Sequence, residues 1–412
     1  MTAISQDFAP PFKLIAPYFI IGVVIYLLSA IFALFVDVST LYFLDVAVLG
    51  WVHLFLLGFV MMIIFGAMAQ LVPVVLEVGH FGVEFFYIIW PLLLIGTILM
   101  CIGFVYVPAL LPYGGTVVLI SMLIFVLDIF LTIKKVKKFN FAMTSVIIAN
   151  IFLFLGVIVG IILALGYAGQ IEVDINTLLK AHVYLVVGGY IIVTIMGLSM
   201  VLLPMFGLSH HFSCKPVEIA LGTMSGGVIL VVIASLFDIA IVAYLGYLFS
   251  IVSLFLYFYQ GAILYATRAR KEHDIYAISL YYSFSALIVS LILGIAYLLN
   301  GAQSILLSSG WLMMTGFFGF LITGHLYKIV PFLIWFERFS PLVGKEKVPM
   351  LADMVPNKSA KAQFFFSAIG ISIATTGLLI SSNILFKAGI SSLVVGAIFL
   401  LQSLIYMIRF KK

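Results

Sequence analysis

Apolar runs follow one another along almost the whole chain, separated by short polar segments. A run of about 20 apolar residues is long enough to cross a bilayer as an α-helix. The pattern predicts twelve spanning helices, with Asp238 and Lys387 as the polar marks between the seventh and eighth and between the last two. The expected bounds are 14–36, 49–75, 83–107, 113–133, 142–168, 177–206, 216–237, 239–265, 276–299, 304–335, 364–386 and 388–408.

Composition supports a membrane protein. Of the 412 residues, 65% are hydrophobic and 8% are charged, whereas soluble domains carry roughly 25% charged residues. The net charge of +5 resides between the apolar runs, which excludes a nucleic-acid-binding face. The N-terminus lacks the basic stretch and cleavage site of a signal peptide, so the first run is expected to be a retained helix. Cys101 and Cys214 lie on different segments and predict no cysteine metal site.

The distribution of Lys and Arg predicts the orientation. With both termini in the cytoplasm, eighteen of the twenty basic residues fall in inner segments, and only Lys180 and Lys387 fall outside. We therefore expect a multi-pass protein of the inner membrane in contact with the lipid bilayer. The longest inner segment, 337–363, contains three prolines and is interpreted as a loop.

One helix pattern recurs. A glycine followed seven residues later by a proline ends the stretch Trp51–Pro73, and similar apolar sequence precedes each copy. The copies are Gly66/Pro73, Gly197/Pro204 and Gly324/Pro331, which are 131 and 127 residues apart. Each interval holds four predicted helices, so the chain is expected to be one membrane domain of three pseudo-repeats, approximately 14–133, 142–265 and 276–408. Proline interrupts helical hydrogen bonding, and glycine lets a neighbouring helix or a flat cofactor approach closely.

These features resemble subunit I of the haem-copper oxidases. FGAMAQLVPVV (65–75) and TGHLYKIVPF (323–332) are similar to the ends of the second and tenth helices of that family. The stretch following Gly324 also resembles uncharacterised bacterial relatives, and NnrS-type haem and copper proteins belong to the same wider group. The resemblance implies a haem ligand near the outer end of the second helix, with copper as a further option, and other respiratory subunits or a redox donor as partners.

The chain also departs from the family. Trp311 lies twenty residues before Pro331, as His53 lies twenty before Pro73, where the family has a His-x-His pair. The seventh helix has no His-His pair, and His182 and Tyr184 do not have the spacing of the family's copper ligand and tyrosine. A complete oxygen-reducing centre is therefore not expected. A zinc protease is equally unsupported, because no His-Glu-x-x-His occurs.

The histidines are the candidate ligands. His53 and His182 both lie near the outer ends of their helices and are level enough to bind one haem, or they are interfacial residues that bond to neighbouring helices. His325 lies about 20 Å deeper, estimated at 1.5 Å per residue, so it is not expected to share an iron with His53. A second metal, a proton path with Lys328, or an inner-face pair are its alternatives.

Other polar groups complete the candidates. Gln70, Tyr184 and Asp128 lie within predicted spans, and Asp128 is expected to form a salt bridge with the KKVKK run at 134–138. His80 and His273 fall in loops and are expected to be solvated, whereas a metal site at His210, His211 and Cys214 is a weaker alternative. The leading hypothesis is a haem-binding protein with a respiratory or nitric-oxide-response role. The alternatives are a transporter or channel for a metal ion or small polar solute, and a cofactor-free structural subunit.

Overall fold

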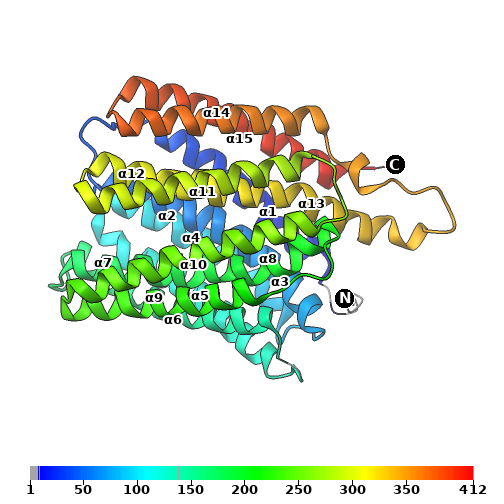
Figure 1. Cartoon of the computed structure of the whole chain (residues 1–412), viewed down its shortest axis with the longest axis horizontal. Coiled ribbons are helices and arrows are strands. Elements are labelled where there is room, and N and C mark those ends of the chain that lie inside the picture. The colour runs from blue at the N-terminus through cyan, green and yellow to red at the C-terminus, as the bar shows by residue number, and fades with distance from the viewer. Residues whose placement is uncertain (1–7, 9, 138, 412) are drawn as a thin grey trace. The chain divides into compact units, whose positions relative to one another are not determined.

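The computed structural model describes residue 8, residues 10–137 and residues 139–411, and throughout these residues the chain is built from helices (Figure 1). The α-helices are α1 (Phe12–Ala33), α2 (Val46–Phe55), α3 (Met62–Leu76), α4 (Phe86–Val105), α5 (Leu111–Ile133), α6 (Phe141–Tyr167), α7 (Ile175–Val183), α8 (Val193–Gly207), α9 (Lys215–Phe237), α10 (Ala240–Thr267), α11 (Ile275–Asn300), α12 (Gln303–Trp311), α13 (Gly319–Arg338), α14 (Asn357–Leu379) and α15 (Asn383–Arg409). Three π-helical segments are η1 (Leu56–Met61), η4 (Tyr184–Ile192) and η5 (Leu312–Phe318). Short 3₁₀ turns are η2 (Val83–Phe85), η3 (Pro108–Leu110), η6 (Ser340–Leu342) and η7 (Leu351–Met354).

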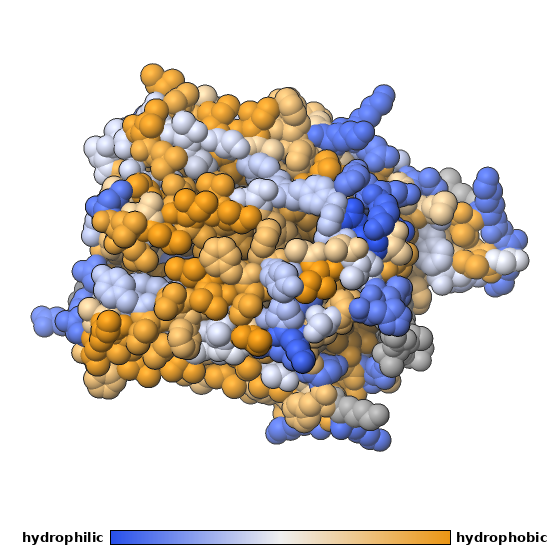
Figure 2. Space-filling view, viewed as in Figure 1, coloured by the Kyte–Doolittle hydropathy of each residue, from blue (hydrophilic) through white to orange (hydrophobic). Residues whose placement is uncertain are grey.

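The prediction of twelve spanning helices is confirmed for the described residues, because twelve continuous helices are long and apolar enough to cross a membrane. In the face drawn in Figure 2, apolar residues cover most of the helix sides and hydrophilic residues gather toward helix ends and loops. Such apolar sides are suited to lipid and not to water. The protein is therefore a multi-pass membrane protein, and its described residues form an all-α fold.

The expected turn at Asp238 is confirmed, since this residue ends α9 with a left-handed φ of 51°. The expected turn at Lys387 is wrong. The chain reverses at residues 380–382, where Ser381 has a φ of 53° and the Ser382 hydroxyl caps the amide of Leu385, so Lys387 lies inside α15. Apolar content alone did not locate this turn, because small polar caps interrupt hydrophobicity only weakly.

The expected loop at 337–363 is also corrected. Helix α13 continues to Arg338, and α14 begins at Asn357, immediately after Pro356. Residues 357–363 are thus helical despite two lysines. Proline is favourable at a helix start because its φ is fixed and its missing N–H is not needed there.

The chain divides into two compact units. The first unit contains Met68–Lys271, in which α4 packs on α5 and α9 packs on α10. The second unit contains Pro11–Ala67 and the chain from Glu272 onward, in which α14 packs on α15 and α1 also contacts α15. The helix that includes α3 passes from the second unit into the first between Ala67 and Met68.

The second, sixth and tenth spans have the same order of segments: an α-helix, a π-helical segment and a second α-helix. Each contains one of the π-helical segments η1, η4 and η5, and each segment ends 12 or 13 residues before its proline, at Met61, Ile192 and Phe318. A further glycine lies eight residues before each repeat glycine, giving the pattern Gly-x7-Gly-x6-Pro in all three spans. These added glycines are Gly58, Gly189 and Gly316. π-helical turns are rare and often accompany functional sites.

Each repeat glycine faces the preceding span. A Cβ atom added to Gly66 would lie 2.6 Å from Cβ of Tyr18, and the corresponding distances are 2.6 Å from Gly197 to Ser145 and 2.8 Å from Gly324 to Ser279. The upstream glycines contact residues seven positions further along the same partner helices. These contacts are Gly58 with Ile25, Gly189 with Phe152 and Gly316 with Ala286. The glycines thus permit close helix packing, which is one of the two roles expected for them.

Candidate functional site

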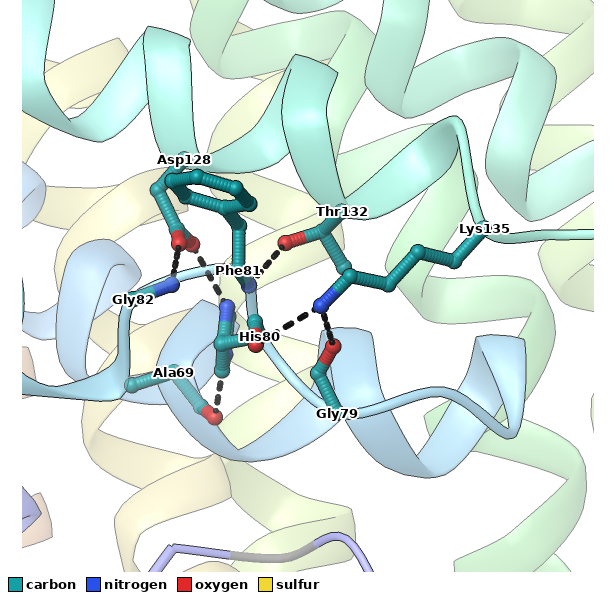
Figure 3. Close-up of polar contacts among 8 residues, drawn as sticks. All are labelled: Ala69, Gly79, His80, Phe81, Gly82, Asp128, Thr132 and Lys135. Atoms are coloured by element: carbon teal, nitrogen blue, oxygen red, sulfur yellow. Dashed lines mark hydrogen bonds and ion pairs between the residues drawn. The ribbon is translucent and has the colours of Figure 1, made fainter.

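A buried histidine–aspartate pair lies in the first unit and is bonded on all sides (Figure 3). Nδ1 of His80 lies 2.6 Å from Oδ2 of Asp128, and the exposed fraction of both side chains is 0%. Nε2 of His80 lies 2.9 Å from the carbonyl oxygen of Ala69. The other carboxylate oxygen of Asp128 accepts a hydrogen bond of 2.9 Å from the amide of Gly82. Both ring nitrogens and both carboxylate oxygens therefore have partners.

The sequence explains why a histidine is needed here. In an α-helix the carbonyl of Ala69 would accept from the amide of residue 73, but Pro73 has no N–H. The ring of His80 replaces that missing donor, because a carbonyl only accepts. Nε2 must then carry a proton, and a second proton is shared between Nδ1 and Oδ2 of Asp128. The distance of 2.6 Å suits such a charge-assisted bond.

The loop that carries His80 is held by further contacts from α5 and the residues after it. The amide of Phe81 donates to Oγ1 of Thr132 at 2.9 Å. Nζ of Lys135 donates to the carbonyls of Gly79 and His80, at 3.2 and 3.1 Å. Figure 3 shows these contacts converging on residues 79–82 from one side. The loop is thereby tied to the end of α5 and to the residues after it.

Two predictions are corrected by this arrangement. His80 was expected to be solvated, but its ring is buried because it completes the hydrogen bonding at Ala69. Asp128 was expected to pair with the KKVKK run, yet its partners are His80 and the Gly82 amide. Lys135, from that run, instead binds backbone carbonyls. The missed signal is the proline-freed carbonyl together with an intramembrane carboxylate that requires a partner.

His53 belongs to the second unit and is half-buried. Its Nδ1 lies 2.8 Å from the carbonyl of Leu49, one turn earlier in α2, and η1 begins three residues after it. Because the carbonyl accepts, Nδ1 carries the proton, and in the neutral ring Nε2 carries the lone pair. Histidine ligands of metals commonly have this second hydrogen bond, which fixes the tautomer.

An aromatic cluster lies in the same unit. The Trp51 and Trp311 rings are 5.0 Å apart, and Trp311 also meets Phe386 at 5.7 Å. The indole N–H of Trp51 donates to the carbonyl of Ser29, whereas the buried indole N–H of Trp311 has no hydrogen-bond partner among the described residues. Trp311 thus presents an unsatisfied donor within an aromatic environment.

His182 lies in the first unit and packs against a neighbouring helix. Its Nδ1 is 2.8 Å from the carbonyl of Gly156 in α6, and a Cβ atom added to Gly160 would lie 2.9 Å from its Cε1 atom. Counting back twenty residues from Pro204 gives Tyr184 and not His182. A two-residue offset turns a side chain by about 200° around an α-helix. By its spacing from the proline, His53 therefore corresponds to Tyr184 and Trp311. The Tyr184 ring lies 5.7 Å from that of Tyr247.

His325 belongs to a polar cluster in the second unit. Its Nδ1 lies 2.7 Å from the carbonyl of Leu321, and its Nε2 lies 3.4 Å from the Tyr276 hydroxyl. Lys328 forms an ion pair of 2.5 Å with Asp274 and lies 5.6 Å from the centre of the Tyr276 ring. The structure therefore brings His325 and Lys328 to the same tyrosine, although the charge partner of Lys328 is Asp274.

The remaining candidates are more isolated. Gln70 is buried and its Oε1 atom has no hydrogen-bond partner among the described residues. His273 is exposed, as expected, and its Nδ1 lies 3.0 Å from the Tyr281 hydroxyl. Burial and the nearby Glu218 raise the pKa of the Cys214 thiol, which favours the protonated form over a metal-binding thiolate. In the part of the chain that the structure describes, no three His, Cys, Asp or Glu side chains are grouped to hold a metal ion.

Fold and polar groups together define a twelve-span membrane protein with buried histidines in both units. No protein-family model matches the chain, and a search of curated proteins also finds no match.

Proposed function

We propose that the chain is an integral membrane protein with the architecture of haem-copper oxidase subunit I, built from three four-span repeats. The repeat proposal is supported by the shared Gly-x7-Gly-x6-Pro pattern and by the π-helical segment at the same place in each copy. The three glycine pairs also contact equivalent positions of the preceding span. Chance occurrence of glycine and proline does not account for a shared pattern of partners.

Within this architecture, His53 is proposed as an axial ligand of haem. The observation that carries the proposal is the bond from Nδ1 to the Leu49 carbonyl, which sets Nε2 as the lone-pair nitrogen. The unsatisfied N–H of Trp311 is a suitable donor for a carboxylate such as a haem propionate. The repeat glycines do not leave space for a haem, because side chains of the neighbouring helix lie against them. A bound haem would supply one-electron transfer or binding of a small gaseous ligand.

The proposed role is respiratory or a response to nitric oxide, in the inner membrane with both termini in the cytoplasm. A redox donor or other respiratory subunits would be its partners. Oxygen reduction by this chain alone is not proposed, because the histidines expected for copper are missing from the seventh span. His182 is proposed only as a secondary ligand, since its ring packs on Gly160.

A visible spectrum and a pyridine haemochrome assay of the purified protein test this function. We expect a Soret band in the wild type, its loss in His53→Ala, and its retention in His273→Ala, which removes an exposed histidine. His182→Ala tests separately whether that histidine contributes to the spectrum. Absence of haem after expression with abundant haem supply would refute the proposal, as would an unchanged spectrum in His53→Ala.

A second candidate, a transporter or channel for a polar solute or ion, is favoured by a different observation. Gln260 in α10 is fully buried, and neither its amide oxygen nor its amide nitrogen has a hydrogen-bond partner among the described residues. Asn150 Oδ1 in α6 and Thr194 Oγ1 in α8 are also buried without partners. Unsatisfied polar groups are costly within a bilayer and are characteristic of solute pathways.

Proteoliposomes test this alternative with protons as the probe, using a pH-sensitive dye trapped inside. Transport predicts dissipation of an imposed pH gradient faster than in empty liposomes. Gln260→Leu should slow this flux, whereas the control Gln402→Leu, at an exposed position of α15, should not. Equal rates in empty and protein-containing liposomes would count against proton conduction.

A further inference from the structure

A basic recess lies where the tenth and twelfth spans end in the second unit. It has a volume of about 650 Å³ and is lined by Arg338, Phe339, Ile408, Arg409, Phe410 and Lys411. Arg338 is the last residue of α13 and Arg409 the last of α15, so the recess lies at the level where both helices leave the membrane-spanning region. Figure 1 shows the final turn of α15 leading to the chain end marked C.

Specific contacts build the recess. Nη1 of Arg338 donates a hydrogen bond of 3.0 Å to the carbonyl of Phe410. The Phe339 and Phe410 rings meet edge to face, with their centres 6.2 Å apart, and Phe339 is buried. This aromatic contact and the Arg338 bond hold the ends of the two helices together. The recess is therefore built by the ends of two helices and by the residues directly after them.

The charged side chains that line the recess are all positive. Among the described residues, the lining has three basic side chains and no side-chain carboxylate. Glu337, next to Arg338, is engaged elsewhere, because its Oε2 atom accepts a hydrogen bond of 2.9 Å from the amide of Phe12. Arg338 and Arg409 complement the negative ends of their helix dipoles. A guanidinium nevertheless has five donors, and the bond to Phe410 uses one of those of Arg338.

These observations identify the chemistry of a ligand. A phosphate group is matched by guanidinium donors and a neighbouring ammonium, and the side chains of Phe339 and Ile408 supply an apolar wall. The headgroups of phospholipids occupy the same level as the ends of spanning helices, and basic pockets between such helices bind acidic lipid headgroups. We propose that this recess binds the phosphodiester headgroup of an anionic phospholipid.

The general enrichment of Lys and Arg at the cytoplasmic ends of spanning helices does not account for the recess. Basic residues are common at cytoplasmic ends of membrane proteins, and Lys345 and Lys347 are examples, since both are exposed in the loop between α13 and α14. Those lysines do not line the recess. They provide a control that removes two positive charges from the adjoining loop without changing the proposed site.

Native mass spectrometry of the full-length protein from nanodiscs tests the proposal. The nanodiscs contain phosphatidylglycerol and phosphatidylcholine in equal amounts, and the retained lipids are counted. We expect retained phosphatidylglycerol to fall by about tenfold or more in Arg409→Gln/Lys411→Gln, with each charge contributing about fivefold or less. The control Lys345→Gln/Lys347→Gln should retain wild-type amounts. Arg338→Lys keeps the charge and should lose less lipid than Arg338→Gln.

Competition distinguishes the source of the phosphate. Inorganic phosphate at millimolar concentration should not displace the lipid if the apolar wall contributes to binding. Displacement of phosphatidylglycerol by inorganic phosphate would show a simple anion site and overturn the lipid assignment. Equal retention in the recess variant and the loop control would overturn the site itself. Intact folding of each variant is verified by its thermal unfolding temperature in the same nanodiscs.

Discussion

The imidazole of His80 donates a hydrogen bond to the carbonyl oxygen of Ala69, at an N···O distance of 2.9 Å. Pro73 makes this bond necessary, because it removes the amide that would otherwise pair with that carbonyl. The other nitrogen of the same ring binds Asp128. The His80 side chain therefore links the carbonyl of α3 that lacks its helical donor to the buried carboxylate of Asp128 on α5.

His80→Ala should strongly destabilise the first unit. It leaves the carboxylate of Asp128 buried without its cationic or proton-sharing partner, and breaking such a pair from one side costs about 3–5 kcal/mol. The free energy of unfolding, measured by denaturant titration in detergent, should fall by that amount. His273→Ala, at an exposed histidine, is the control and should change it by less than about 0.5 kcal/mol. Similar losses of unfolding free energy in the two variants would show that the His80–Asp128 pair does not stabilise the fold.

Pro73→Ala should partly rescue His80→Ala. Alanine restores an amide at position 73, which can donate to the Ala69 carbonyl once the His80 ring is gone. One backbone hydrogen bond contributes about 1 kcal/mol, so the double variant should be more stable than His80→Ala by about this amount. A double-mutant cycle on the unfolding free energy measures the coupling. Strict additivity of the two changes would contradict the role assigned to Pro73.

Much of the fold follows from the sequence because spanning helices require long apolar runs, and the twelve runs were all recognisable. The errors lie at helix ends. Hydropathy places a turn at Lys387, whereas Ser381 and Ser382 form it. Polar residues hide the start of α14 at Asn357. Caps and left-handed residues depend on local backbone geometry, which hydropathy does not record.

The candidate site was less predictable. Repeat prolines could be counted, but the partner of the carbonyl that Pro73 frees depends on where the loop at residues 79–82 folds back. Position alone could not show that His80 is buried or that His182 packs on Gly160. The π-helical segments were also invisible in the sequence, because no residue type requires them. Their common register became apparent only with the backbone.

Alanine at the repeat glycines should destabilise the protein at all three positions. The new Cβ atom of Gly66→Ala would lie 2.6 Å from Cβ of Tyr18, which is too close without movement of the helices. Overpacking of this kind typically costs about 1–3 kcal/mol. Gly197→Ala and Gly324→Ala should behave similarly, because they meet Ser145 and Ser279 at 2.6 and 2.8 Å. Thermal unfolding in detergent measures the effect.

Gly222→Ala is the matched control for these variants. Gly222 also lies within a spanning helix, but beyond the adjoining backbone of its own helix no atom lies within 4 Å of its added Cβ. Alanine has the higher helix propensity, so this variant should be neutral or more stable by up to about 1 kcal/mol. Equal destabilisation at Gly222 and Gly66 would indicate that backbone flexibility, and not close packing, explains the repeat glycines.

Acid should loosen the start of α7. The side chain of Asp174 accepts hydrogen bonds from the Thr177 hydroxyl and amide, and these bonds lower the pKa of Asp174 below its ordinary value of 3.8. The cap is therefore fully present above pH 3.8 and is lost as the pH falls through the lower, folded-state pKa. Hydrogen exchange in the first turn of α7, corrected for its intrinsic pH dependence, should accelerate in that range. The start of α6 is the internal control, because Asn140 caps the Met143 amide without a titratable group. Asp174→Asn should abolish the pH dependence in α7, and an unchanged profile in that variant would assign the loosening to another group.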